Sequence, residues 1–243
     1  MKKLVMVSMV LLLAAGSAHA AVTFYGEDAG TGDELVPRTD WPGSDAAKNA
    51  FIGVLGSYGF ESFEGFDDGT SMDGQALLFS NGVTATFTGP MVVTELLPGT
   101  TNGLGRYPTD GVKYIDGSIS QFQIDFDQNI TAFGFYGIDI GDFGGESALQ
   151  LFQDATPVAS TVIPFTFPAE YGAVLFLGVT SADAPFNRVV ITNTNPGSPT
   201  GWYDGFGYDY MIVSTSVVPA PGAILLCSLG TGVVGLLRRR RAL

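Results

Sequence analysis

Glycine and proline interrupt this sequence every few residues, and the interruptions limit what it can fold into. The chain has 33 Gly and 13 Pro in 243 residues. Most apolar stretches between them are too short for helices and have the length of strands. In 119–126, Phe122, Ile124 and Phe126 alternate with polar residues, as in a half-buried strand. Many short strands separated by turns predict an all-β, antiparallel β-sandwich, with a jelly roll as the preferred topology.

Strands are expected in most of the body and a helix in one place. Residues 45–50 form the best helix candidate, with Ser44 as its N-cap. Ser80, Asn81 and Gly82 predict a tight turn between two strands. The expected strands are 22–25, 75–79, 83–88, 91–96, 119–126, 130–140, 148–152, 158–165, 173–179, 188–194 and 206–213.

The N-terminal segment 1–20 has the pattern of a secretory signal peptide. Two lysines precede an apolar core at 4–15, and the small residues Ala18 and Ala20 occupy the −3 and −1 positions of a cleavage site. The core is short for an uncleaved anchor. We therefore expect passage through the Sec translocon, a mature β-sandwich domain at 21–213 and a polar linker at 214–218.

The C-terminal segment 219–243 reads as a membrane-directed tail. A turn of Pro219, Ala220, Pro221 and Gly222 precedes the apolar run 223–237. Four arginines follow, namely Arg238, Arg239, Arg240 and Arg241. A short transmembrane helix with a cytoplasmic arginine cluster would leave the body outside the cytoplasm. A permanent single-pass anchor is the alternative to a processed tail.

This tail resembles the PEP-CTERM sorting signal of bacterial surface proteins. The resemblance covers about a tenth of the chain, and Ala220 stands where that family usually has Glu. It implies recognition by an exosortase-type sorting enzyme at the inner membrane. It also implies a final place at the cell surface or in the extracellular polysaccharide matrix, and it assigns no activity to the body.

Charge and composition exclude several functions of the body. Two lysines and four arginines belong to the ends, so the body keeps 5 of the 11 basic residues and all 24 acidic ones, a net charge of −19. Such a body repels nucleic acid. His19 is the only histidine and Cys227 the only cysteine, and both lie in the ends. Catalytic Ser-His-Asp or Cys-His groups and the usual zinc sites are thus excluded from the body.

The body itself resembles the lectin-like jelly-roll modules found in PEP-CTERM proteins. The matching segments are Phe63–Glu64, 133–137, 176–179 and 204–209. The resemblance implies a structural Ca²⁺ held by Glu64, Asp204 and Asp209, because an early Glu and a late Asp meet where first and last strands are neighbours. Tyr210 replaces the second Asp that usually closes this pattern. No other cofactor is expected.

A non-catalytic surface protein is therefore the preferred interpretation. We expect it to bind carbohydrate through exposed aromatic rings, with Trp41, Trp202 and Tyr203 as the candidates. The alternative is a secreted carbohydrate-active enzyme with paired carboxylates, in which Asp139 would act with Glu64 or Asp204.

Overall fold

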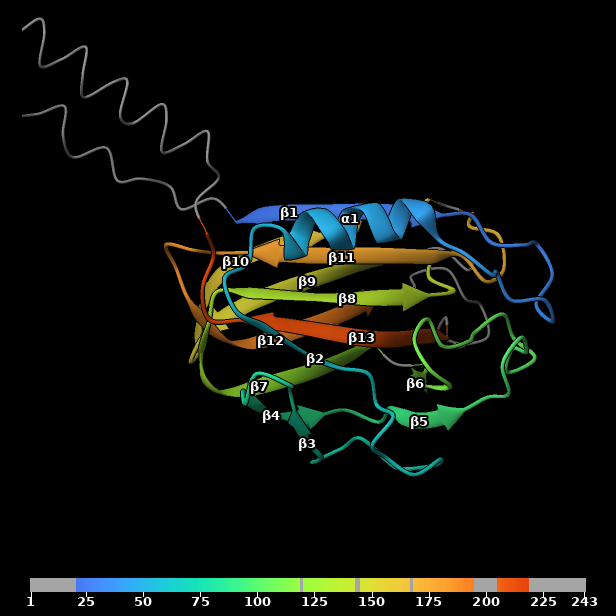
Figure 1. Cartoon of the computed structure of the whole chain (residues 1–243), viewed down its shortest axis with the longest axis horizontal. Coiled ribbons are helices and arrows are strands. Elements are labelled where there is room, and N and C mark those ends of the chain that lie inside the picture. Colours follow the sequence, from blue (N-terminus) through green and yellow to red (C-terminus); the bar gives the residue numbers. More distant parts are fainter. Residues whose placement is uncertain (1–20, 119, 143–144, 167, 195–204, 219–243) are drawn as a thin grey trace, which may run out of the picture.

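The computed structural model describes residues 21–118, 120–142, 145–166, 168–194 and 205–218. These residues form two antiparallel sheets packed face to face, with one helix on the outside (Figure 1). The predicted all-β antiparallel sandwich is thereby confirmed. One sheet has the order β1 (Val22–Asp28), β11 (Val174–Thr180), β8 (Ala132–Ile138), β13 (Phe206–Ser214), β6 (Lys113–Gly117) and β5 (Val92–Glu95), with β2 (Tyr58–Glu61) also paired to β13. The other has the order β10 (Thr156–Val162), β9 (Glu146–Gln153), β12 (Phe186–Thr194), β7 (Gln121–Ile130), β4 (Thr84–Thr88) and β3 (Ala76–Leu78).

From β6 onward the chain crosses repeatedly between the sheets. In space these eight strands have the order β6-β13-β8-β11 in one sheet and β7-β12-β9-β10 in the other. The last strand, β13, therefore lies between β8 and β6. The first strand of the chain, β1, pairs with β11 instead. The expected contact between first and last strands is thus replaced by the pairing of β2 with β13.

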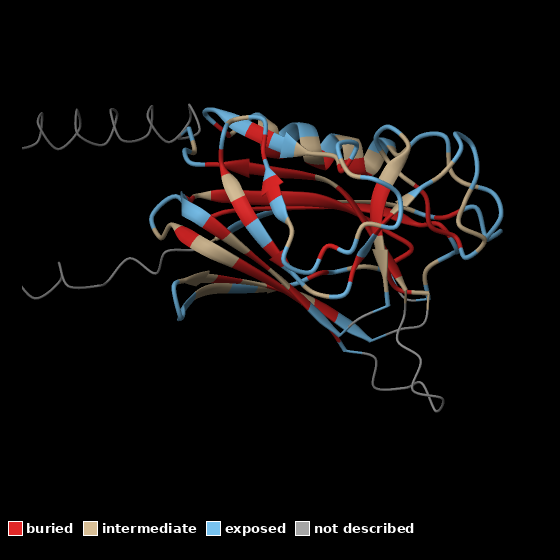
Figure 2. Ribbon diagram, turned by 90° about the horizontal axis from the view of Figure 1, so that it is seen from below, coloured by how far each residue is buried: buried red, intermediate tan, exposed pale blue. Residues whose placement is uncertain are grey.

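The main core lies between the sheets and is rich in phenylalanine. Phe122, Ile124 and Phe126 of β7 all face it, which confirms the alternation expected from the sequence. A second, smaller buried cluster lies under the helix on the outer face of the seven-stranded sheet. Figure 2 shows buried residues concentrated between the layers and beneath the helix.

The helix α1 spans Pro42–Ile52 and covers β1 and β11. It is longer than the predicted 45–50, and Ser44 is not its N-cap: the Ser44 hydroxyl lies inside the helix and donates to the carbonyl oxygen of Val174 at 3.0 Å. The unpaired backbone N–H groups at the start of α1 instead donate to a side chain at the end of β1. The Asp28 carboxylate accepts from the amides of Gly43 and Ser44 at 3.0 and 2.8 Å.

The strands β2 and β6 were not expected from the sequence. Both are short and contain glycine or charged residues, and β13 provides the backbone partner of each. The segment 214–218, expected as a linker, is bonded to the body: Val218 donates its amide to Val54, and Gly56 donates to Ser216. The start of β1 and the end of β13 lie at the same end of the sandwich (Figure 1). No helix among the described residues is long and apolar enough to cross a membrane.

Candidate functional site

Several predicted site residues fall outside the described ranges. The structure describes Trp41, Glu64, Asp139 and Asp209. The others are Trp202, Tyr203 and Asp204, the cleavage residues Ala18 and Ala20, and the sorting residues Pro219, Ala220, Pro221, Gly222, Arg238, Arg239, Arg240 and Arg241.

Glu64 and Asp209 both hold the loop that leads into β6. Glu64 Oε1 accepts the amides of Val112 and Lys113, each at 2.8 Å. Asp209 is fully buried, and its Oδ2 accepts the Thr109 amide, the Thr109 hydroxyl and the Asp110 amide at 2.7, 3.0 and 2.9 Å. Burial raises the pKa of Asp209 to about 8, although these donors oppose the rise.

These contacts bear on the predicted calcium site. An N–H group directed at a carboxylate oxygen occupies a position that a cation would otherwise take. Among the described residues, no group of three His, Cys, Asp or Glu side chains is arranged to hold a metal ion. Glu64 and Asp209 alone therefore do not form a cation cage, and a calcium site that includes Asp204 stays a prediction.

Asp139 belongs to a polar cluster at the end of β8. It is 3% exposed, and its Oδ1 accepts the Gly172 amide at 2.9 Å. Burial raises its pKa to about 7, the negative charges of Asp142 and Asp116 add to the rise, and Arg106 opposes it. Such a pKa is often found at functional sites. Glu64 is exposed and bonded to a different part of the molecule, so the two carboxylates proposed as a catalytic pair have separate roles in the fold.

A row of aromatic rings crosses the outer face of the seven-stranded sheet, between α1 and β2. We call it the aromatic surface and define it as Trp41, Tyr58, Phe60, Tyr136 and Tyr210. The ring centres of Trp41 and Tyr136 are 6.4 Å apart, and those of Tyr136 and Tyr210 are 6.5 Å apart. Phe60 stacks on Tyr210 at 4.9 Å. Tyr58 and Phe60 are 39% and 36% exposed, so the β2 end of the row faces solvent.

Two charged residues of α1 border this surface. The Lys48 ammonium lies 5.0 and 5.4 Å from the ring centres of Tyr136 and Tyr210 and pairs with Asp45 at 3.2 Å. The Tyr136 hydroxyl donates to the Asp45 carboxylate, and burial with this acceptor raises the pKa of Tyr136. The surface thus combines apolar ring faces with fixed hydrogen-bonding groups.

A β-bulge brings Tyr210 into this row. Asp209 lies opposite Tyr136, but Ile212 lies opposite Gly134, so β13 has one residue more than β8 here. Tyr210 has φ 47°, a left-handed conformation that costs about 1–2 kcal/mol in a residue other than glycine. Asp209 Oδ1 accepts the Tyr210 amide at 2.7 Å and supports this conformation. The fold therefore tolerates local strain to place this ring outward.

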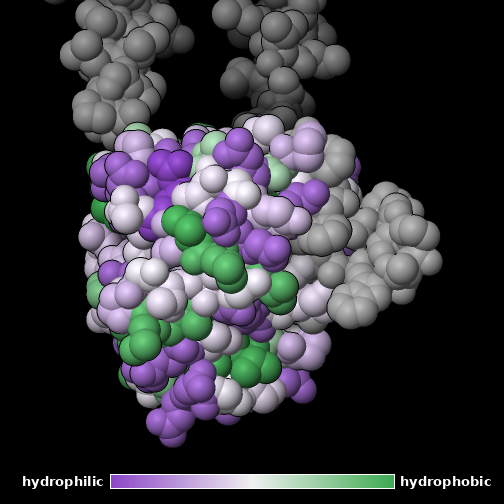
Figure 3. Space-filling model, turned by 90° about the vertical axis from the view of Figure 1, so that its right-hand side faces the viewer, coloured by the Kyte–Doolittle hydropathy of each residue, from purple (hydrophilic) through white to green (hydrophobic). Residues whose placement is uncertain are grey.

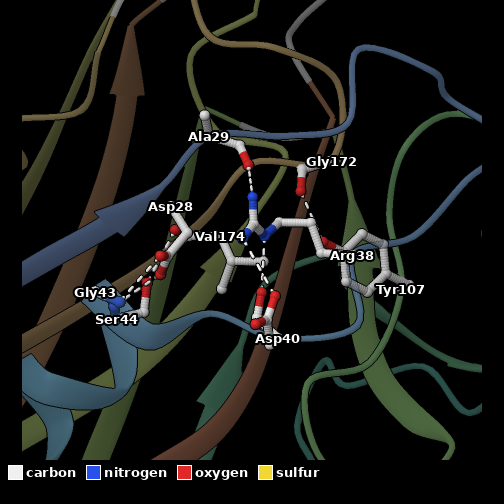
Figure 4. Close-up of polar contacts among 9 residues, drawn as sticks. All are labelled: Asp28, Ala29, Arg38, Asp40, Gly43, Ser44, Tyr107, Gly172 and Val174. Atoms are coloured by element: carbon white, nitrogen blue, oxygen red, sulfur yellow. Dashed lines mark hydrogen bonds and ion pairs between the residues drawn. The ribbon is translucent and has the colours of Figure 1, made fainter.

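Trp41 follows a loop between β1 and α1 that hydrogen bonds of Arg38 hold in place (Figure 4). The Arg38 guanidinium donates to the carbonyl oxygens of Ala29 and Asp40, and it pairs with the Asp40 carboxylate at 3.4 Å. On its other side Trp41 contacts the ring of Tyr107, whose hydroxyl donates to the carbonyl oxygen of Gly172 at 2.7 Å. Trp41 is thus a half-buried ring in a fixed position, which is what a binding residue requires.

The loop end of the sandwich has a different character. Figure 3 looks at this end and shows hydrophobic side chains in separate patches among hydrophilic ones. The loops 29–41 and 96–112, joined by the bond from the Gly105 amide to Glu34, carry the exposed Leu35, Leu97 and Leu104. Two cavities of about 290 Å³ lie elsewhere, one between the edges of β1 and β10 and one beside Glu27 and Glu170. Of the predicted site residues that the structure describes, none lines either cavity.

Sequence reasoning identified only Trp41 of the aromatic surface. A signal for the others exists in part, because Tyr58 and Phe60 alternate with glycine and so share one face of a strand. Tyr136 lies in the expected strand 130–140, which gives no sign of a functional ring, and it is 2% exposed. The outward position of Tyr210 depends on the bulge, which the alternating pattern does not reveal.

Comparison with solved structures finds distant neighbours. No protein-family model and no curated protein matches the sequence. Among solved structures, the K2 cleaved adhesin domain of Lys-gingipain has 12% identity and a TM-score of 0.42, over 65% of this chain and 98% of that chain. Isomalto-dextranase of Arthrobacter globiformis T6, complexed with panose, has 12% identity and a TM-score of 0.33, over 77% of this chain and 36% of that chain. A cyclase from Fischerella sp. has 12% identity and a TM-score of 0.34, over 66% of this chain and 100% of that chain. Function must therefore be argued from this chain's own residues.

Proposed function

We propose that this chain is an exported, non-catalytic surface or extracellular-matrix protein that binds carbohydrate through its aromatic surface. The observation that carries the proposal is the fixed row from Trp41 to Phe60, with the rings at its β2 end exposed. The C–H groups on one side of a sugar ring form an apolar face that packs against an aromatic ring. Lys48, Asp45 and the exposed Asp110 provide polar groups for the hydroxyls at its border.

The strand order supports a lectin-like jelly roll within this proposal. The orders β6-β13-β8-β11 and β7-β12-β9-β10 are those of eight strands wound as two Greek keys. The remaining strands, β1 to β5, extend the edges of the two sheets. A structural Ca²⁺ that includes Asp204 belongs to the same proposal.

Export and sorting rest on the two ends of the sequence. The signal peptide directs the chain through the Sec translocon, and an exosortase-type enzyme then processes the tail at Pro219–Gly222. Cell fractionation with an epitope in the body is the test. Release from the inner membrane should require both the tail and the sorting enzyme. Retention in the inner membrane in every strain would favour the permanent anchor.

Carbohydrate binding is tested with full-length chain in mild detergent against immobilised polysaccharides. Replacing Tyr58 or Tyr210 by Ala should weaken binding about fivefold, since an aromatic contact contributes about 1 kcal/mol. Tyr171→Ala is the matched control, because Tyr171 is 38% exposed and lies outside the aromatic surface. Equal loss in all three variants, or no loss in any, would refute the proposed site.

The enzyme alternative needs its own test. Turnover of any polysaccharide that is abolished by Asp139→Asn or Glu64→Gln would replace the proposal with a carboxylate-dependent enzyme. The present proposal expects the same polysaccharides to be bound and recovered intact.

A further inference from the structure

Every basic side chain of the body already has an acidic partner. The five ion pairs join Arg38 to Asp40, Lys48 to Asp45, Arg106 to Asp116, Lys113 to Glu95 and Arg188 to Asp125. In the described part of the chain no basic group remains available to attract an anion. The body carries 24 acidic residues against these five basic ones, so its negative charge is in large excess. An anionic polymer approaching this body meets repulsion.

Asp110 borders the aromatic surface. It is exposed, and its amide donates to Asp209 Oδ2 at 2.9 Å, while Asp209 Oδ1 accepts the amide of Tyr210 at 2.7 Å. The charge of Asp110 also contributes, after burial, to the raised pKa of Tyr210. An aromatic ring and a negative charge are thus adjacent at the exposed end of the row.

Lys48 shows how this surface accommodates a cation. Its ammonium group lies over two rings of the row and pairs with the Asp45 carboxylate. A similar combination is available to a ligand at the exposed rings of Tyr58 and Phe60, with Asp110 near Tyr210 as the carboxylate. A ligand ammonium placed there would gain the attraction of the ring and of the carboxylate together.

We infer that the carbohydrate bound at the aromatic surface is a cationic amino-sugar polymer, one with free protonated amines, and not a uronic acid polymer. The inference rests on the proposed function and names the class of its ligand. The sugar ring stacks on Tyr58 or Phe60, and its ammonium group faces Asp110. The acidic body adds long-range attraction that falls with salt.

Binding of three soluble tetrasaccharides to the full-length chain in detergent tests the inference. The probes are a glucosamine tetramer with free amines, its fully N-acetylated counterpart and a uronic acid tetramer. We expect the free-amine tetramer to bind at least tenfold more tightly than either of the others at low salt. Salt should reduce this preference. Lys48→Gln, which removes a competing cation, should raise affinity for the free-amine tetramer.

Matched charge variants separate a site from diffuse attraction. Asp110→Asn should weaken binding of the free-amine tetramer about threefold, as expected for one partly exposed charge. Asp154→Asn removes the same charge from the β9–β10 turn, where φ is 55°, a conformation that Asn tolerates, and should leave binding unchanged. Equal effects of the two variants would overturn the inference.

The outcomes also distinguish this inference from the proposed function. Equal or tighter binding of the N-acetylated or uronic acid tetramer, if it is weakened by Tyr58→Ala, refutes the cationic ligand and leaves the aromatic surface as a carbohydrate site. Binding of all probes that is indifferent to Tyr58→Ala and Tyr210→Ala refutes both.

Discussion

Two buried carboxyl groups predict that this protein loses stability as pH rises. Asp209 and Asp139 have pKa values of about 8 and about 7, both raised by burial from an ordinary value of 3.8. Their folded-state pKa values lie above the unfolded ones, so the stabilisation is complete below about pH 4. It is lost progressively from about pH 4 up to the folded-state pKa values of about 7 and 8, because over this range the unfolded chain releases the two protons and the folded chain keeps them.

The size of the effect follows from the number of protons. Between pH 5 and pH 7 the unfolded chain has released both protons, while the folded chain retains most of them. Each group lowers the free energy of unfolding by up to about 1.4 kcal/mol per pH unit. The two together account for about 5 kcal/mol over this interval, a large part of the stability of an ordinary domain.

Urea unfolding of the wild-type chain and of Asp209→Asn at pH 5, 6, 7 and 8 measures this dependence. Asn is uncharged and keeps one oxygen for the Thr109 and Asp110 amides, so the variant should lose about half of the pH slope. Repulsion among surface carboxylates also lowers the free energy of unfolding as pH rises, and Asp154→Asn is the control for this effect. This variant should keep the wild-type slope. An unchanged slope in Asp209→Asn would show that Asp209 is ionised in the folded protein and that the donors outweigh burial.

The remaining predictions concern packing and calcium. Phe51→Ala should lower the free energy of unfolding by about 3–5 kcal/mol in urea titrations, because Phe51 lies on the inner face of α1 and is fully buried. A loss below 1 kcal/mol would contradict this packing. Gly178→Ala should also destabilise, since its Cβ would lie 2.6 Å from Phe51 Cδ2, and Phe51→Leu should relieve part of that loss in the double variant. If Ca²⁺ binds as predicted, the melting temperature should rise with added Ca²⁺ and fall with a chelator; identical melting curves would contradict a calcium site.

Local patterns were sufficient for much of the fold. In β7 every second side chain faces the core, and in β8 all side chains are buried. Both patterns are visible in the sequence, the first as an alternation of apolar and polar residues and the second as an apolar run. The sequences of β2 and β6 show neither pattern, because these segments become strands through pairing with β13. The start of α1 was misplaced for a related reason. Its cap, Asp28, lies 14 residues before Pro42 and reaches it only through the packing of α1 on β1.

The candidate site divides in the same way. The sequence by itself determined the charge of the body and the absence of His and Cys from it, because composition is enough for these. The two terminal signals are predictions from linear order. The sequence also identified Trp41 as a candidate. Only the tertiary structure decided that Trp41, Tyr136, Tyr210 and Phe60 form one row, since they come from a loop and three strands that are distant in sequence.

The roles of the carboxylates were likewise decided by the tertiary structure. Glu64 and Asp209 are clustered acids in the sequence, and the fold directs both at N–H groups of the loop before β6. Each basic residue finds its acidic partner through the fold, in some cases across strands, as Arg188 on β12 does with Asp125 on β7. Composition fixes how many charges a chain carries, whereas pairing depends on which side chains the backbone hydrogen bonds bring together.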